Sequence, residues 1–298
     1  MRIATTTVSD SVLAQIQKLS NRQSQLQNQV ATGQRIFKPE DDPSAVGRIL
    51  TLDTEARQIQ QFKNNADRAL EVSQATYAGL QDMKKISDRA GEIATLGAGT
   101  SSPDAYRAYA TEVNQLIEQA LQNGNTKLRN DYLFSGTALT TAPLTATRNV
   151  AGDITAVAYA GDAAQSKIQI SELSQLAPGS TGATNAGNAA FLTSLIALRD
   201  ALNSGVSTNV SAAQPGLETA ENLLVNSLSE QGAVQLRIEV AQSQQTSRST
   251  NIEKQVSNEA DADMATSAVK LSQTSTAYEA ALSSATKILQ MSLLDYLK

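Results

Sequence analysis

The chain of 298 residues contains no cysteine, no histidine and no tryptophan. Without cysteine and histidine there can be no disulfide, no Cys/His zinc or iron–sulfur site, and no catalysis by a thiol or an imidazole. We therefore predict no catalytic residue, no metal site and no cofactor, and we expect the chain to depend on packing and assembly for its strength.

Aromatic residues make up only 4% of the chain although 41% is hydrophobic, so the apolar side chains are mainly Ala, Leu, Ile and Val. This composition favours thin helical bundles. The net charge of −5 and the lack of a basic stripe argue against a nucleic-acid partner. No apolar run is long enough for membrane insertion, and residues 1–6 lack the apolar region of a secretory signal. These features alone predict a cytoplasmic protein.

A heptad repeat without Pro or Gly dominates the C-terminal segment. Its apolar and small residues alternate in steps of four and three, as in the contact seam of a coiled coil. The predicted seam is Met264, Ala268, Leu271, Ser275, Tyr278, Leu282, Ala285 and Leu289. A seam of this length requires a partner helix of similar length.

The other end of the chain supplies that partner. The same alternation is found in Val12, Ile16, Leu19, Gln23, Leu26 and Val30, and Gly33 then ends the helix. Two such helices at opposite ends predict a chain that folds back on itself. Terminal coiled-coil helices often serve assembly, because one pair buries little surface. The predicted assembly interface is Val12, Ile16, Leu19, Leu26, Val30, Met264, Leu271, Tyr278, Leu282, Leu289, Leu293 and Leu294.

The segments between these helices complete a mainly α fold. Asp42 precedes Pro43 and is expected to cap a helix running to about residue 96. Further helices are expected from 102 or 104 to about 129, from 188 to 203, and from 212 to 251, the last leading directly into the C-terminal helix. Short alternating stretches, 154–159 and 167–170, predict a few β-strands.

We thus expect an elongated helical bundle or coiled coil, formed by the paired N- and C-terminal segments, with a small β-rich insertion. The predicted divisions are a terminal coiled-coil domain (1–43 and 255–298), a helical trunk (44–139 and 188–254) and an outward insertion (140–187). If the insertion is only decoration, deletion of residues 141–178 should be tolerated.

Isolated motifs give no support to an enzyme. Ser284-Ala285-Thr286-Lys287 matches an S-x-x-K pattern, but its companion motifs are missing and Ala285 lies on the heptad seam. The acidic pairs Asp41/Asp42 and Asp261/Asp263 are interpreted as helix caps rather than cation ligands, because no EF-hand spacing surrounds them.

Three stretches resemble the flagellin family, and specifically its hook–filament junction branch (FlgL type, third hook-associated protein). They are Val30-Ala31-Thr32-Gly33-Gln34-Arg35 continuing to Asp41-Asp42-Pro43; Asp131-Tyr132-Leu133-Phe134-Ser135-Gly136-Thr137; and the C-terminal stretch from Leu289 to Leu297. The resemblance covers roughly residues 1–137 and 191–298. In the middle segment, the best match is Tyr159-Ala160-Gly161-Asp162.

The resemblance implies more than the heptads do. It implies export through the flagellar type III apparatus without a cleaved signal peptide, and an extracellular place in the bacterial flagellum. It implies a homo-oligomeric ring or filament, in which terminal helices form an inner coiled coil. Its implied partners are a FlgK-type junction protein, flagellin and a FlgN-type export chaperone.

Three other functions remain open at this point. A flagellin that polymerises into the filament shaft would have the same trunk. A secreted enzyme or carbohydrate-binding module could be carried on the insertion, although about forty residues without an aromatic cluster make a poor site. A cytoplasmic coiled-coil scaffold would explain the heptads but not the three motif stretches.

Overall fold

The computed structural model describes the backbone of residues 2–99 and 102–296, and the side-chain surroundings of residues 10–99 and 102–287. The fold is mainly α, as predicted. The chain divides into two compact units, Met1–Arg57 with Ser249–Lys298, and Gln58–Arg248. The predicted three-part division stays a prediction. In the described part of the chain, no helix has the length and apolar character needed to span a membrane.

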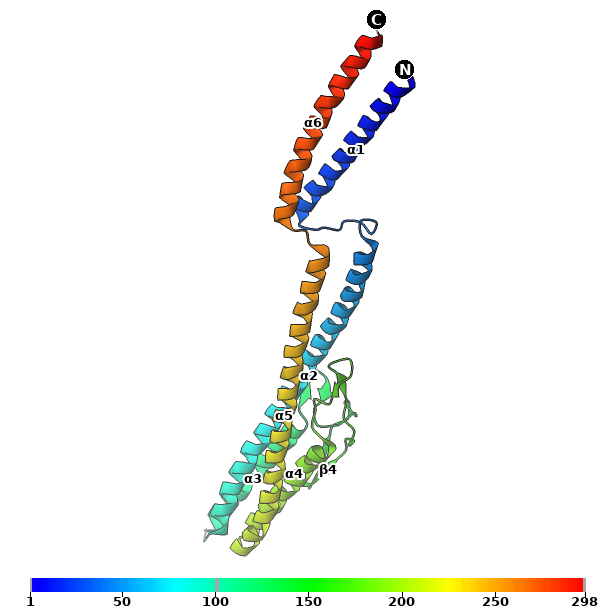
Figure 1. Cartoon of the computed structure of the whole chain (residues 1–298). Helices are drawn as coiled ribbons and strands as arrows, with labels where there is room; N and C mark the ends of the chain where they lie inside the picture. Colours follow the sequence, from blue (N-terminus) through cyan, green and yellow to red (C-terminus); the bar gives the residue numbers. More distant parts are fainter. Residues whose placement is uncertain (1, 100–101, 297–298) are drawn as a thin grey trace. The chain divides into compact units, whose positions relative to one another are not determined.

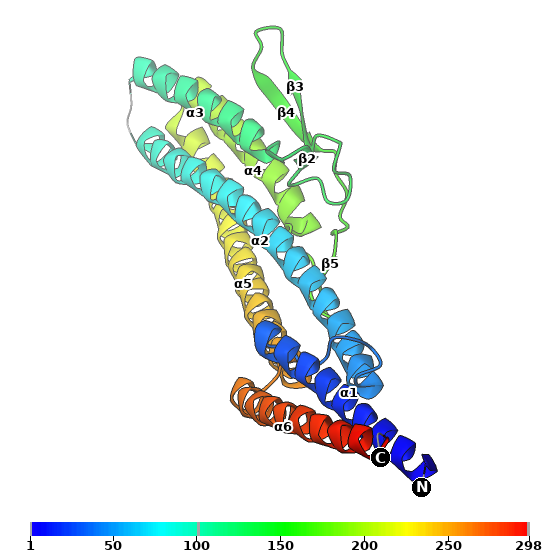
Figure 2. The same ribbon diagram turned by 90° about the horizontal axis from the view of Figure 1, so that it is seen from above.

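The first unit contains a pair of helices made from the two ends of the chain. Helix α1 (Arg2–Thr32) lies antiparallel to α6 (Met264–Tyr296), so that both termini are at the same end of this pair (Figures 1 and 2). Gly33 ends α1 with a φ of +75°, a conformation that favours glycine, and its N–H donates to the Gln29 carbonyl. The predicted C-cap is confirmed.

Local capping explains where the following helices begin. Asp42 Oδ1 accepts a 3.0 Å hydrogen bond from the Ala45 N–H, and α2 (Pro43–Ala98) starts with proline at its first position. Asp263 Oδ1 accepts from the Ala265 N–H at the start of α6. Ser102 caps α3 (Pro103–Gly124). The acidic residues Asp42 and Asp263 therefore act as caps, as the sequence predicts.

The C-terminal helices differ from the prediction in one respect. The sequence predicts that the helix ending near residue 251 leads directly into the C-terminal helix. Instead, α5 (Ser207–Ala260) ends at Ala260, and Asp261 to Asp263 separate it from α6. Residues 261–263 contain two carboxylates that bond to neighbouring hydroxyls or N–H groups in place of the helix ladder.

The second unit packs parts of α2 and α5 with α3 and α4 (Gly182–Asn203) around an apolar core. Helix α4 begins six residues before the predicted position, because Thr181 caps it. Fully buried members of the apolar core include Leu80, Ile117, Phe134 and Phe191. Aliphatic side chains dominate this core and its buried aromatic residues are Tyr106, Phe134 and Phe191, which agrees with the low aromatic content.

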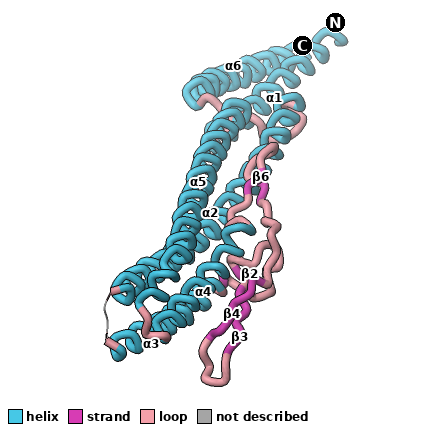
Figure 3. The backbone as a smooth tube through the Cα atoms, turned by 90° about the horizontal axis from the view of Figure 1, so that it is seen from below, coloured by secondary structure: helices cyan, strands magenta, loops and turns pink. Residues whose placement is uncertain are grey.

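Three short antiparallel strand pairs lie in the second unit (Figure 3). They are β1 (Lys127–Leu128) with β2 (Asp131–Tyr132), β3 (Leu144–Arg148) with β4 (Ile154–Tyr159), and β5 (Ile168–Gln169) with β6 (Gln175–Leu176). Strand β1 occupies residues for which the sequence predicts the end of a helix, because α3 stops at Gly124.

The hairpin β3–β4 is part of the apolar core. Leu144 and Ile154 are buried, and Arg199 of α4 is 6% exposed while donating 2.6 Å to the Ile154 carbonyl and 3.1 Å to Asn114 Oδ1. The aliphatic anchors and the buried guanidinium bind the hairpin to α3 and α4. This packing argues against the expectation that residues 141–178 can be deleted without consequence.

Two of the motifs noted in the sequence meet in this unit. Asp162 of the Tyr159–Asp162 stretch accepts hydrogen bonds from the Thr137 hydroxyl, from the Thr137 N–H at 2.8 Å and from the Ala164 N–H at 3.1 Å. These bonds lower the pKa of Asp162. Gly136 has a φ of +73°, and a Cβ there would lie 2.2 Å from the Asp162 carboxylate. The turn therefore requires glycine.

We predict that Ile154→Ala lowers the free energy of unfolding by roughly 2–5 kcal/mol, because it leaves a cavity between the hairpin and α4. Urea denaturation followed by circular dichroism would measure the change. Val150→Ala, at the fully exposed tip of the same hairpin, is the matched control and should change the stability little. A stable protein lacking residues 141–178 would contradict the assignment of this hairpin to the core.

Candidate assembly site

The α1 side of the terminal helix pair follows the predicted seam. Leu26 is buried, and Val12, Ile16, Leu19, Gln23 and Val30 are half-buried, whereas most intervening side chains are exposed. A heptad step of four and three keeps such residues on one stripe, which here faces α6. The less exposed side of α1 is thus the side that carries the predicted heptad seam.

The contact face of α6 agrees with the predicted seam at only every second position. At the other positions, the more buried residue is the one just before the predicted residue. The most buried side chains of this face are Ser267 and Thr274, with half-buried Leu271, Ser275, Tyr278, Ala281 and Ala285 completing the stripe. The aliphatic side chains of α1 thus face a stripe on α6 in which small residues outnumber the large ones, Leu271 and Tyr278. Thr274 loses no hydrogen bond in this position, since its hydroxyl donates to the Lys270 carbonyl at 2.7 Å.

Two residues of the predicted assembly interface are consequently left outside this pair. Met264 is 46% exposed and Leu282 is 41% exposed. Val269 and Leu13 are also exposed, which leaves apolar side chains on the outer surface of both helices. Leu289, Leu293 and Leu294 lie outside the residues whose side chains the structure describes. Their role in assembly stays a prediction.

Two linkers, residues 33–35 after α1 and residues 260–262 before α6, contact each other where the helix pair joins α2 and α5. We call this contact the crossing. The Arg35 N–H donates 2.7 Å to the Ala260 carbonyl, and the Ala262 N–H donates 2.7 Å to the Gly33 carbonyl. Residues 33–35 and 260–262 thus run antiparallel side by side, with Gln34 opposite Asp261 in an isolated β-bridge. These backbone bonds tie the end of α1 to the start of α6.

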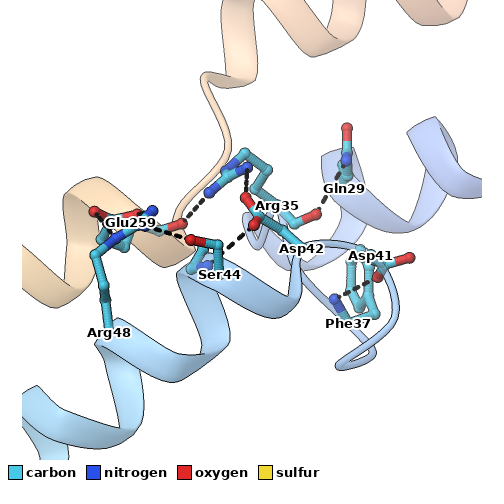
Figure 4. Close-up of polar contacts among 9 residues, drawn as sticks. Gln29, Arg35, Phe37, Asp41, Asp42, Ser44, Arg48 and Glu259 are labelled. Atoms are coloured by element: carbon cyan, nitrogen blue, oxygen red, sulfur yellow. Dashed lines mark hydrogen bonds and ion pairs between the residues drawn. The ribbon is translucent and has the colours of Figure 1, made fainter.

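A network of charged side chains surrounds this crossing (Figure 4). Arg48 of α2 forms a two-pronged ion pair with Glu259 of α5, with N···O distances of 2.9 and 2.8 Å. Arg35 donates 2.7 Å to the Glu259 carbonyl and 3.2 Å to Asp42 Oδ2. Arg35, which lies between α1 and α2, therefore bonds both to the cap of α2 and to the end of α5.

These contacts shift the pKa values of the acids. The Arg48 guanidinium lowers the pKa of Glu259, and the Ala45 N–H together with Arg35 lowers the pKa of Asp42. Since each folded-state pKa lies below its unfolded value, the folded chain binds fewer protons. The resulting stabilisation is present above the unfolded pKa and is lost as the pH falls through the folded pKa.

Sequence reasoning identified only half of this network. Asp42 was interpreted as a cap, and Arg35 belongs to a stretch chosen for its family resemblance. Arg48 and Glu259 were missed, because they are 211 positions apart and each sits on a charged helix surface that looks ordinary in isolation. No periodicity or spacing in the sequence connects them.

A polar groove of about 330 Å³ lies between the last turns of α1 and the first turns of α6. Arg22, Arg35, Asp263 and Lys270 line it together with amide and hydroxyl side chains. Among the described residues, no group of three acids forms a plausible metal site. The residues of the S-x-x-K pattern, Ser284 and Lys287, are exposed on α6.

Comparisons with known proteins agree with this geometry. The sequence model of the bacterial flagellin N-terminal helical region matches residues 3–139, and that of the bacterial flagellin C-terminal helical region matches residues 207–297. The chain belongs to the flagellin family. Each matched region includes one member of the α1–α6 pair, and the segment between the two regions contains β3 to β6 and all of α4.

Flagellar hook-associated protein 3 of Escherichia coli (strain K12) is 24% identical over 207 residues, covering 64% of this chain and 62% of that relative. The alignment thus spans under two thirds of either protein. A solved structure described as a putative flagellar hook-associated protein from Vibrio parahaemolyticus has a TM-score of 0.66 and 16% identity, covering 74% of this chain and all of that chain. The crystal structure of FlgL from Bacillus cereus has a TM-score of 0.60 and 14% identity, covering 70% of this chain and 99% of that chain. These structures share the fold.

We predict that Glu259→Gln loosens the crossing, because the variant keeps the shape of the side chain but loses the ion pair with Arg48. Hydrogen exchange at the Arg35 and Ala262 amides should become faster at neutral pH. In the unmodified chain, protection of these amides should fall as the pH drops below the ordinary pKa values of Glu259 and Asp42, because both carboxylates, whose pKa values the fold lowers, then take up protons.

Glu239→Gln is the control, since it removes an exposed carboxylate on α5 for which the described residues offer no ion-pair partner. The Arg35 and Ala262 amides should exchange normally in that variant. Unchanged exchange in Glu259→Gln would show that the backbone bonds hold the crossing without the ion pair.

Proposed function

We propose that this protein is a structural subunit of the bacterial flagellum that acts at the junction between hook and filament. The name of the relative from Escherichia coli supports this assignment, as do the structures with which the fold is shared. The observation that carries the role as an assembling structural subunit is the antiparallel α1–α6 pair with apolar side chains remaining on its outer surface. Such a pair is suited to association with further helices.

In this proposal, the subunits form a ring or short helical assembly through α1 and α6. The hook side would contact a FlgK-type junction protein, and the distal side would contact flagellin. The chain would be exported by the flagellar type III apparatus with a FlgN-type chaperone protecting the apolar face of α6, and it would reside outside the cell. We assign it no enzymatic activity.

The alternative is a flagellin that forms the filament shaft. The family and the terminal helix pair fit both functions, whereas the relatives named for hook association favour the junction. A deletion of the gene distinguishes the two. Cells should be imaged by electron microscopy while flagellin in the medium is measured by immunoblotting, with a plasmid copy of the unmodified gene as the control.

We expect the deletion to give hooks without filaments and flagellin lost to the medium, because a missing adapter leaves flagellin no platform on which to polymerise. Bare hooks without shed flagellin, or shortened filaments, would instead support the shaft protein. Unchanged flagella would contradict a flagellar role and favour a cytoplasmic scaffold.

We also predict that Leu282→Asp and Leu26→Asp fail to incorporate into flagella for different reasons. Leu282 is 41% exposed in the single chain, so its replacement should preserve monomer stability while placing a charge against neighbouring subunits. Leu26 is buried between α1 and α6, so its replacement should destabilise the pair itself by about 3 kcal/mol or more.

Immunoblots of purified flagella would measure incorporation, and hydrogen exchange of the purified monomer would measure the integrity of the pair. Leu173→Asp, at a fully exposed position between β5 and β6, is the control and should incorporate normally. Normal incorporation of Leu282→Asp would contradict the proposal that the outer face of α6 contacts neighbouring subunits.

A further inference from the structure

A pocket of about 370 Å³ lies within the second unit. Three segments form it: α2, the β1–β2 turn with the residues that follow it, and residues 165–168 with 178–180 at the base of the β5–β6 pair. Its volume falls in the range of about 300–1,000 Å³ that is typical of small-molecule sites. Neither the α1–α6 pair nor the crossing contributes a residue to it, so the proposed function makes no use of this pocket.

The walls of this pocket are mainly apolar. The apolar lining residues that are buried or half-buried are Val72, Leu128, Tyr132, Leu133, Ile168 and Pro178. Lys127 lies 4.3 Å from the centre of the Tyr132 ring, and this cation–π contact helps to hold the ring in place. A preformed apolar pocket with a few polar groups at its edge is the usual form of a site for a small organic molecule.

Arg129 lines the same pocket in a backbone conformation that is unusual for arginine. Among the residues that the structure describes, it alone has a positive φ, of +59°, without being glycine. Glycine or asparagine would fit this place in the two-residue β1–β2 turn more readily. The Arg129 guanidinium forms an ion pair of 2.7 Å with Glu71 of α2, which also lines the pocket. Unfavourable backbone conformations of this kind are concentrated at functional sites, ligand sites among them.

Two further charged side chains of the lining are not paired in this way. Arg68 and Asp131 have no ion-pair or hydrogen-bond partner within the described part of the chain. Exposed charges without partners are common on protein surfaces, but these two lie on the lining of an apolar pocket. Because Glu71 and Arg129 neutralise each other, the pocket offers one available positive charge and one available negative charge to a ligand.

We propose that this pocket binds a free α-amino acid with a large apolar side chain, such as phenylalanine or leucine. The apolar side chain of the ligand lies between the walls, its carboxylate meets Arg68 and its ammonium group meets Asp131. A purely apolar molecule would leave both charges without a partner, and a fatty acid or an amine would pair with only one of them. The combination of apolar walls and two opposite charges therefore favours a zwitterion.

The test uses three probes with the same apolar body. L-Phenylalanine carries both charges, 3-phenylpropionate lacks the ammonium group, and phenethylamine lacks the carboxylate. Isothermal titration calorimetry of the purified full chain would measure the affinity of each probe. Saturation-transfer difference NMR would show whether the phenyl ring is the part of the probe that contacts the protein.

Two variants each remove one charge from the pocket, Arg68→Gln and Asp131→Asn. The matched controls are Arg107→Gln and Asp104→Asn, which remove the same charges from the surface of α3, outside the pocket. All four positions are exposed, so every variant should keep the helical content of the unmodified chain. Circular dichroism would check this before the titrations.

We expect L-phenylalanine to bind with a Kd of about 1 mM or below, as is usual for a ligand of about twelve non-hydrogen atoms. Each of the other two probes should bind about fivefold more weakly, because it loses one exposed ion pair. Arg68→Gln should weaken the binding of L-phenylalanine and 3-phenylpropionate but not that of phenethylamine. Asp131→Asn should weaken the binding of L-phenylalanine and phenethylamine but not that of 3-phenylpropionate.

This crossed pattern separates direct contact from a structural effect, since a distorted pocket would weaken all three probes alike. The two control variants should bind each probe as the unmodified chain does. The inference would be overturned by a lack of saturable L-phenylalanine binding, by equal affinities for the three probes, or by equal loss of all three in a pocket variant. None of these results bears on the gene deletion that tests the proposed function, so the two can fail independently.

Discussion

The antiparallel contact between α1 and α6 is the interaction on which the first unit depends. It joins segments separated by more than 230 positions, from Thr32 to Met264, and it packs branched aliphatic side chains on α1 against a stripe of α6 that is mostly small residues but includes Leu271 and Tyr278. Small residues let helix backbones approach closely. They also provide little apolar area, so the pair gains less from burial than one with leucine on both sides.

The side chains that α6 turns toward α1 affect both the stability of the pair and the apolar surface that α6 leaves exposed. If Met264 and Leu282 faced α1, the pair would be more stable but its outer surface would have less to offer a neighbour. With Ser267 and Thr274 turned inward instead, larger apolar groups remain exposed. A moderately stable pair with unused apolar surface is what a subunit requires when its terminal helices are to be completed by other copies.

The crossing at residues 33–35 and 260–262 is built from different interactions. Backbone hydrogen bonds define it, and exposed ion pairs of Arg35 and Arg48 surround it. Exposed charges are sensitive to salt and contribute modestly to stability. In the second unit, the hairpin β3–β4 is held by a buried polar group as well, because Arg199 donates to the Ile154 carbonyl. The first unit therefore has a polar, solvent-accessible connection, whereas the hairpin β3–β4 is fixed within an apolar core.

Features determined by neighbours in the sequence were predictable from the sequence alone. Heptad spacing gave the contact face of α1, Asp42 with Pro43 gave the start of α2, and Gly33 gave the end of α1, because these depend on helix periodicity, capping and backbone sterics. The tertiary structure decided which face of α6 turns inward, that Arg48 meets Glu259, and that Ile154 enters the core of the second unit. These depend on the shape and charge of residues far away in the chain, and neither periodicity nor local propensity records them.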